Sequence, residues 1–125
     1  MAEFRAALRQ FLRRTERIAR RAGLTPQRYL LLLMVQGAAD GSEQSTVTEL
    51  AERLQLAQST VTELVSRAEE AGLIVREQSQ TDARVAHLRL SAEGERRLSE
   101  AFTGLAAERS NLRDAFSHLD AGVIS

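Results

Sequence analysis

The stretch STVTELAERLQLAQSTVTELVSRAEEAGLIVREQSQTDARVAHLRL, residues 45–90, decides the fold of this chain. It opens with Thr46-Val47-Thr48-Glu49, a capping box in which a hydroxyl and a carboxylate satisfy backbone groups at a helix N-terminus. Apolar residues then recur at three- and four-residue spacing in two runs, interrupted at Gln55-Leu56. The first run is Val47, Leu50, Ala51 and Leu54, and the second is Val61, Leu64, Val65 and Ala68. The pattern predicts a helix-turn-helix whose second helix starts near Gln58.

Two β-prone runs follow the second helix. Gly72 is the residue type expected where a helix stops. Leu73–Val75 and Val85–Leu90 then flank a polar tip, Ser79–Arg84, which is the pattern of a β-hairpin. We therefore predict a wing attached to the helix-turn-helix.

A winged helix-turn-helix places its second helix in the DNA major groove, where exposed side chains meet base edges. Gln, Ser, Thr and Arg have suitable hydrogen-bonding groups, and an arginine on the wing tip can enter an adjacent minor groove. The predicted DNA-contacting residues are Thr46, Gln58, Ser59, Thr60, Thr62, Glu63, Ser66, Arg67, Arg76, Asp82 and Arg84. The alternative is a protein-interaction module whose polar face is only solvated.

The run VTELAERLQLAQSTVTELVSRAEEAGLIVREQSQTDARVAHLRLSAEG resembles the core of the multiple-antibiotic-resistance regulator (MarR) family of winged-helix transcription factors. The matching parts are ELAERL, STV with LVSR, AGLIVR, and the D-x-R…L-S pattern at Asp82, Arg84, Leu90 and Ser91. The resemblance implies a homodimer that binds double-stranded DNA. It also implies three segments: an N-terminal dimerisation helix (1–24), the winged domain (25–91) and C-terminal dimerisation helices (92–125) in a single compact protomer. We expect a repressor acting on an inverted-repeat operator.

Two residues depart from that family pattern. Ala57 stands before the second helix, where Asp or Ser is common and would cap it. Glu63 stands where a basic residue is common; a carboxylate repels phosphate, although it can accept a hydrogen bond from cytosine. The sequence thus predicts either an unusual site or a low affinity.

The charge distribution is unusual for a DNA-binding protein. The 125 residues have no formal net charge, whereas nucleic-acid-binding domains are typically basic. Residues 1–28 hold eight Arg and two Glu, but residues 29–75 hold two Arg and seven acidic residues. We expect acidic residues of the helix-turn-helix to lie away from the groove, among them Glu49, Glu52, Glu69 and Glu70. Binding would then be modest and strongly dependent on salt.

Residues 2–22 form a predicted amphipathic helix, with an apolar stripe on one side and arginines around the rest. Such a helix either packs across a dimer axis, as in the similar family, or lies on an anionic membrane. The two Phe residues of the stripe and the absence of Trp favour the dimer. The predicted dimer-interface residues are Phe4, Leu8, Phe11, Leu12, Phe102, Leu105, Leu112 and Phe116.

The next helix is predicted to begin at Thr25-Pro26 and to bury its apolar run, Tyr29 to Val35. In the similar family the start of this helix borders a cleft for small phenolic or aromatic acids. Arg14, Arg28 and Tyr29 are the candidate effector-binding residues, and the alternative for Tyr29 is an ordinary core position. GAADGSEQS, residues 37–45, reads as a loop, after which Gln44 to Thr46 could add a short strand to the wing.

A last helical tract is predicted from Ala92, capped by Ser91, to about His118, with a kink and restart at Ser110 or Asn111. Residues 121–125 have no helical pattern. The fold class is therefore mainly α with a small β-hairpin, a winged helix-turn-helix flanked by dimerisation helices.

No catalytic constellation emerges from the sequence. His87 and His118 belong to no metal-binding or nucleophile motif, and the Gly-containing loop lacks the phosphate-binding pattern of nucleotide-binding enzymes. The absence of Cys excludes disulfides, thiol switches and thiolate metal sites. YLLLLMV is too short to span a membrane, and no signal peptide is recognisable. We expect a cytoplasmic regulator without cofactor or metal, not an enzyme.

Overall fold

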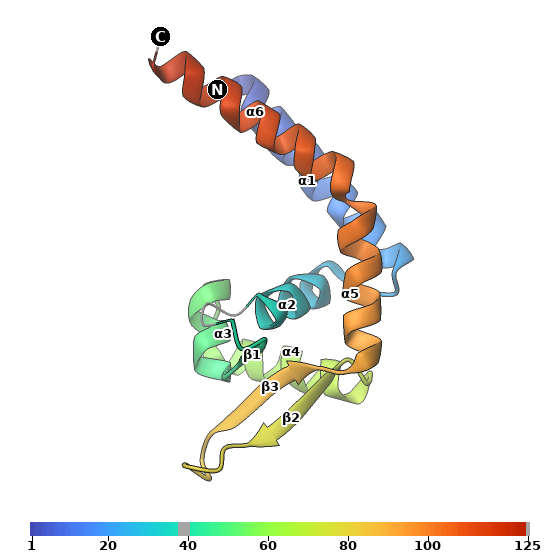
Figure 1. The fold of residues 1–125 in the computed structure, drawn as a ribbon, viewed down its shortest axis with the longest axis vertical. Helices are drawn as coiled ribbons and strands as arrows, with labels where there is room; N and C mark the ends of the chain where they lie inside the picture. Colours follow the sequence, from blue (N-terminus) through green and yellow to red (C-terminus); the bar gives the residue numbers. More distant parts are fainter. Residues whose placement is uncertain (38–40, 125) are drawn as a thin grey trace. The chain divides into compact units, whose positions relative to one another are not determined.

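The structure is a computed structural model that describes residues 1–37 and 41–124, with side chains through residue 119. Six helices and three strands follow one another along this part of the chain (Figure 1). They are α1 (Ala2–Arg21), α2 (Pro26–Gln36), β1 (Gln44–Ser45), α3 (Val47–Leu54), α4 (Gln58–Glu70), β2 (Ile74–Gln78), β3 (Ala86–Leu90), α5 (Ala92–Gly104) and α6 (Ala106–Ile124). The predicted class, mainly α with a winged helix-turn-helix, is confirmed. Of the loop predicted at residues 37–45, positions 38–40 lie outside the described residues.

The chain divides into two compact units. One comprises Gln27–Leu98, here called the winged unit, and the other comprises Met1–Pro26 with Ser99–Ser125, here called the helix-pair unit. The division falls inside α5, whose residues through Leu98 belong to the winged unit.

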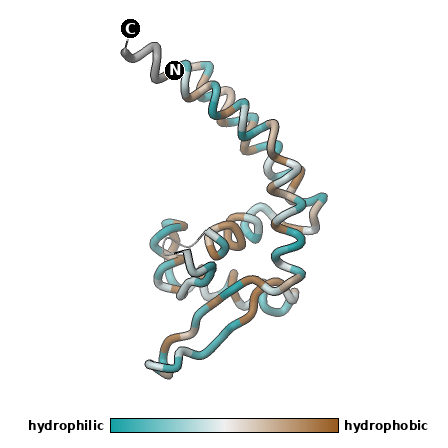
Figure 2. The backbone as a smooth tube through the Cα atoms, in the orientation of Figure 1, coloured by the Kyte–Doolittle hydropathy of each residue, from teal (hydrophilic) through white to brown (hydrophobic). Residues whose placement is uncertain are grey.

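Aliphatic side chains from four elements form the core of the winged unit. They are fully buried and include Leu31, Leu32 and Val35 of α2, Leu50 of α3, Val61 and Val65 of α4, and Leu88 of β3. Figure 2 shows α2 as a largely hydrophobic segment, in agreement with its predicted central position. Leu30 is an exception within that run, because it lies on the outer side of the helix and is 44% exposed.

The wing is a three-stranded antiparallel sheet in the order β1-β3-β2. Strand β3 pairs with β2 from Ile74↔Leu90 to Gln78↔Ala86. On its other side, β3 pairs with β1 through Ser45↔Leu88. The predicted hairpin and the predicted additional strand near Gln44 are both confirmed.

Local sequence signals set the ends of the helices in the winged unit. The Thr46 hydroxyl accepts from the Glu49 N–H at 3.2 Å and the Glu49 carboxylate accepts from the Thr46 N–H at 3.3 Å, which completes the predicted capping box. Gly72 has a φ of 76° after α4, and the Leu73 N–H donates to the Ala68 carbonyl at 2.9 Å. This is the left-handed helix stop for which glycine is favoured.

In the helix-pair unit, α1 packs against α6. The rings of Phe4 and Phe116 meet edge to face with their centroids 6.0 Å apart, and Ala19 of α1 is fully buried. Arg14 forms an ion pair with Glu108 of α6 at 3.7 Å. The predicted amphipathic N-terminal helix is confirmed.

Two details of the C-terminal prediction are wrong. The helical tract breaks at Leu105, between α5 and α6, whereas Ser110 and Asn111 lie inside α6. Gly104, a weak helix former, ends α5 next to the break. Helix α6 also continues to Ile124, although residues after 120 lack an apolar pattern. Propagation of an existing helix needs no such pattern, and a single glycine costs only about 1 kcal/mol.

Candidate nucleic-acid interface

Helix α4 presents a continuous polar face. Val61, Val65 and Ala68 point into the core. The predicted contact residues on the same helix are all exposed: Gln58, Ser59, Thr60, Thr62, Glu63, Ser66 and Arg67. The helical period thus separates the aliphatic side chains from those able to hydrogen bond with base edges.

The N-terminus of α4 has no side-chain cap. Ala57 occupies the N-cap position and makes no capping hydrogen bond, as its sequence predicts. The Gln58 amide instead donates to the Thr48 hydroxyl of α3 at 3.3 Å, which ties together the starts of the two helices. The turn between them contains Gln55 in a left-handed conformation with a φ of 56°, and its side chain donates to the Glu52 carbonyl at 2.6 Å.

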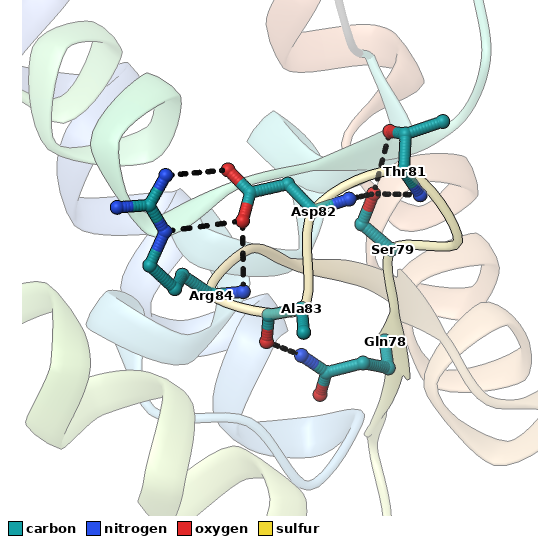
Figure 3. Close-up of polar contacts among 6 residues, drawn as sticks. All are labelled: Gln78, Ser79, Thr81, Asp82, Ala83 and Arg84. Atoms are coloured by element: carbon teal, nitrogen blue, oxygen red, sulfur yellow. Dashed lines mark hydrogen bonds and ion pairs between the residues drawn. The ribbon is translucent and has the colours of Figure 1, made fainter.

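The wing tip holds its arginine in a defined position. Figure 3 shows the Asp82 carboxylate accepting from both the backbone N–H of Arg84, at 3.0 Å, and its guanidinium Nε, at 3.2 Å. These donors lower the pKa of Asp82, the backbone N–H of Arg84 contributing most. The Ser79 hydroxyl accepts from the backbone N–H groups of Thr81 and Asp82. The Arg84 side chain is 91% exposed, so it is oriented and still accessible.

The remaining cations near this face are paired with carboxylates. Arg67 contacts Glu63 and Arg76 contacts Glu69, each pair at 2.6 Å. The hydrogen bond that Arg76 donates to the Glu69 carboxylate raises the pKa of Arg76. Glu69 thus lies beside one of the cations predicted to contact DNA, because the turn after α4 brings Arg76 back to it. The winged unit contains eight Arg and eleven acidic residues, a net charge of −3.

A cleft of about 240 Å³ lies between the start of α3 and the part of the wing where β3 begins. It brings together three residues that the sequence placed in the DNA-contacting set, Thr46, Arg76 and Arg84. Two guanidinium groups beside hydroxyls suit a phosphate oxygen. Thr48 also lines the cleft and was not among the contacts predicted from the sequence. The sequence could have indicated Thr48 as a contact by its position shortly after the capping residue, at the N-terminus of α3.

The candidate effector-binding residues are not gathered in one unit. Arg14 belongs to the helix-pair unit, whereas Arg28 and Tyr29 belong to the winged unit. Tyr29 is only 5% exposed, which favours the core alternative for this residue. A separate cleft of about 260 Å³ in the helix-pair unit is lined by Ile18, Arg21, Ala22, Glu100 and Gly104.

The predicted dimer-interface residues differ in exposure. Leu105 is fully buried within the chain and has no surface left for a partner. Phe4, Phe11 and Leu112 are half-buried. The exposed members are Leu8, Leu12, Phe102 and Phe116.

Within the described residues, no helix is both long and apolar enough to cross a lipid bilayer. The same residues hold no group of three or more side chains that could bind a metal ion.

A small β-sheet behind two short helices, with one polar helix face and an arginine-tipped hairpin, defines a winged helix-turn-helix. The model of the MarR family matches residues 22–85 of the chain. The chain thus belongs to the MarR family, whose members are transcriptional regulators with a DNA-binding fold and not enzymes. A comparison with curated protein sequences gives no significant match.

Solved structures share the fold. A mutant of MarR from E. coli, crystallised with operator DNA, is 16% identical with a TM-score of 0.76, covering 95% of this chain and 86% of that one. The YusO protein from Bacillus subtilis is 25% identical with a TM-score of 0.68, covering 96% and 84%. AbsC, a MarR family transcriptional regulator from Streptomyces coelicolor, is 20% identical with a TM-score of 0.71, covering 91% and 74%.

Proposed function

We propose that this protein is a cytoplasmic repressor that binds an inverted-repeat operator as a homodimer. In this proposal α4 lies in the major groove and Arg84 of the wing reaches the neighbouring minor groove. The observation that carries the proposal is the uninterrupted polar face of α4, exposed from Gln58 to Arg67, beside a wing arginine held by Asp82. The MarR protein crystallised with operator DNA has the same fold.

Exposed apolar side chains on the helix-pair unit support the homodimer. Leu12 is 54% exposed and Phe116 is 58% exposed, and interface cores are rich in such residues. Two copies related by a two-fold axis would present two α4 helices to half-sites about 34–36 Å apart.

A small aromatic or phenolic ligand is the proposed effector. It would act by a population shift. A ligand that binds more tightly to a dimer with one distance between its two α4 helices than to a dimer with another distance favours the first. Isothermal calorimetry with salicylate, with and without bound operator, tests this part. Equal affinity in both states would contradict it.

Selection of bound fragments from random duplex DNA at two salt concentrations tests the DNA-binding proposal. We expect a pseudo-palindromic consensus for the wild-type protein. Gln58→Ala and Ser66→Ala should change which bases are preferred, whereas Arg84→Ala should weaken binding to most sequences and reduce the salt slope by about one per protomer. If Arg84→Ala leaves both affinity and salt slope unchanged, the role given to the wing is wrong.

One observation favours a second candidate, a module that binds a basic protein. The winged unit has a net charge of −3, and the arginines Arg67 and Arg76 are already paired with acids. Failure of the selection to enrich any duplex, together with a stable dimer, would favour this candidate.

A further inference from the structure

The solvent-facing side of α1 carries arginines at every fourth position. We call Arg5, Arg9, Arg13, Arg17 and Arg21 the arginine ridge. All five are exposed, and within the described part of the chain none of them takes part in an ion pair or a side-chain hydrogen bond. Arg14, which lies off the ridge, is the one that pairs with Glu108. The ridge is therefore available to a ligand.

The geometry of α1 directs the ridge away from α6. Phe4 and Ala19 face the helix pair, as the Phe4–Phe116 contact and the full burial of Ala19 show. Residues four apart follow one another along a helix with a rotation of roughly 40° and a rise of about 6 Å. The ridge accordingly winds along the opposite side over about 24 Å, and Arg21 at its end lines the cleft beside Ile18 and Glu100.

This arrangement is unfavourable for the isolated helix. Like charges at four-residue spacing destabilise a helix, and the ridge contains four such pairs. Within the described residues, Glu16 beside the ridge forms no ion pair with it. An anionic ligand would remove this repulsion.

The ridge also accounts for the charge asymmetry of the chain. The helix-pair unit contains nine Arg and six acidic residues, a net charge of +3, opposite to the −3 of the winged unit. Arginines of the winged unit such as Arg67, Arg76 and Arg89 form ion pairs. The uncompensated positive charge thus lies on α1 and not on α4.

We propose that the arginine ridge binds the phosphate backbone of duplex DNA without regard to sequence. Guanidinium groups bind phosphate oxygens through two parallel hydrogen bonds. Phosphates of one DNA strand advance by about 3.4 Å along the axis, so the ridge matches the length of about seven nucleotides. The binding would add salt-dependent affinity that the acidic winged unit cannot supply.

An anionic membrane is the competing ligand, and the packing of α1 disfavours it. A helix that lies on a membrane buries its apolar face among the lipids. On the apolar face of α1, Phe4 packs against Phe116 of α6 and Ala19 is buried. The proposed homodimer would cover the exposed Leu8 and Leu12 of the same face. Without insertion, the ridge offers charge alone, which suits a polyelectrolyte such as DNA.

The test compares two variants of the full-length protein that each lose two positive charges. R9Q/R13Q removes ridge arginines, and R96Q/R113Q is the control, removing exposed arginines of α5 and α6. Affinity for a random duplex of about 30 base pairs is measured by fluorescence anisotropy from about 50 to about 300 mM salt. We expect R9Q/R13Q to reduce the slope of log K against log salt by up to about 1.8 per protomer and to lower the affinity at least about tenfold. The control should retain both values.

Four further measurements make the result decisive. R5Q/R17Q should reproduce the effect, and thermal unfolding of both ridge variants should occur at or above the wild-type temperature because repulsion within α1 is reduced. Selection with R9Q/R13Q should return the same consensus as the wild-type protein, which separates this inference from the proposed operator recognition. Binding of each variant to phosphatidylserine vesicles is measured in parallel. The inference is overturned if R9Q/R13Q keeps the wild-type salt slope or if the control loses as much affinity and slope. It is also overturned if the ridge variants lose binding only to the vesicles.

Discussion

Replacement of Glu63 by Gln should strengthen DNA binding. The Glu63 carboxylate lies on the polar face of α4 and holds the Arg67 guanidinium at 2.6 Å, with both side chains 64% exposed. At an exposed i,i+4 position this pair contributes only about 0.3–0.5 kcal/mol to folding. The unfolding temperature should therefore fall by no more than roughly 2 °C.

The effect on DNA affinity should be larger than the effect on stability. Glu63→Gln removes a charge that repels phosphate, worth about 1 kcal/mol at roughly 4 Å in water, and it releases Arg67 for a phosphate contact. We expect a gain of about fivefold per protomer, since about 1 kcal/mol corresponds to that factor in affinity. The salt slope should also steepen by about 0.9 per protomer.

Fluorescence anisotropy with the selected operator at about 100 mM salt measures this gain. Glu95→Gln is the matched control, because it removes one exposed acidic charge from α5 and should change the affinity little. Weaker binding of Glu63→Gln to the operator, with unchanged salt slope, would refute the reasoning. Glu63 would then be a base-reading acceptor and not a source of repulsion.

Two further predictions concern the folding of the winged unit. A Cβ on Gly94 would clash with the Leu73 carbonyl oxygen. Gly94→Ala should therefore destabilise the protein by about 2–3 kcal/mol in urea unfolding, despite the better helix propensity of Ala. An unchanged urea midpoint would contradict this, because it would show that α5 and the Leu73 backbone can move apart without cost. Hydrogen bonds from Arg96 and then Arg97 lower the pKa of Glu93 from 4.5 to about 2. The stabilisation from ionised Glu93 is therefore complete above pH 4.5 and is lost as the pH falls towards 2. Glu93→Gln should lose stability above pH 4.5 and show a flatter decline in acid, and parallel pH profiles of the two proteins would contradict the assignment.

Features of the fold that depend on neighbouring residues could be predicted from the sequence. The capping box at Thr46, the glycine stop at Gly72 and the polar tip of the wing each use interactions within a few residues, and all three appear in the structure. The break at Leu105 and the extension of α6 to Ile124 could not be predicted. The apolar pattern continues through Leu105 without interruption, and it ends before the last residues of α6.

The candidate site shows the same limit. Exposure of the polar residues between Gln58 and Arg67 follows from helical periodicity. The Asp82–Arg84 pair follows from their spacing of two residues. The pairs Arg76–Glu69 and Arg89–Glu77 join residues seven and twelve positions apart, and their contact depends on how β2 turns back on α4 and on the register of β2 with β3. Sequence alone therefore predicted the exposed polar face of α4 but not which charges neutralise one another.

Hydroxyl-radical footprinting of the selected operator tests the paired use of α4 most directly. A symmetric pair of reading helices should protect two segments of each strand whose centres are about 10–10.5 base pairs apart or a multiple of that spacing. A single protected segment, or uniform protection without an inverted repeat, would contradict the account.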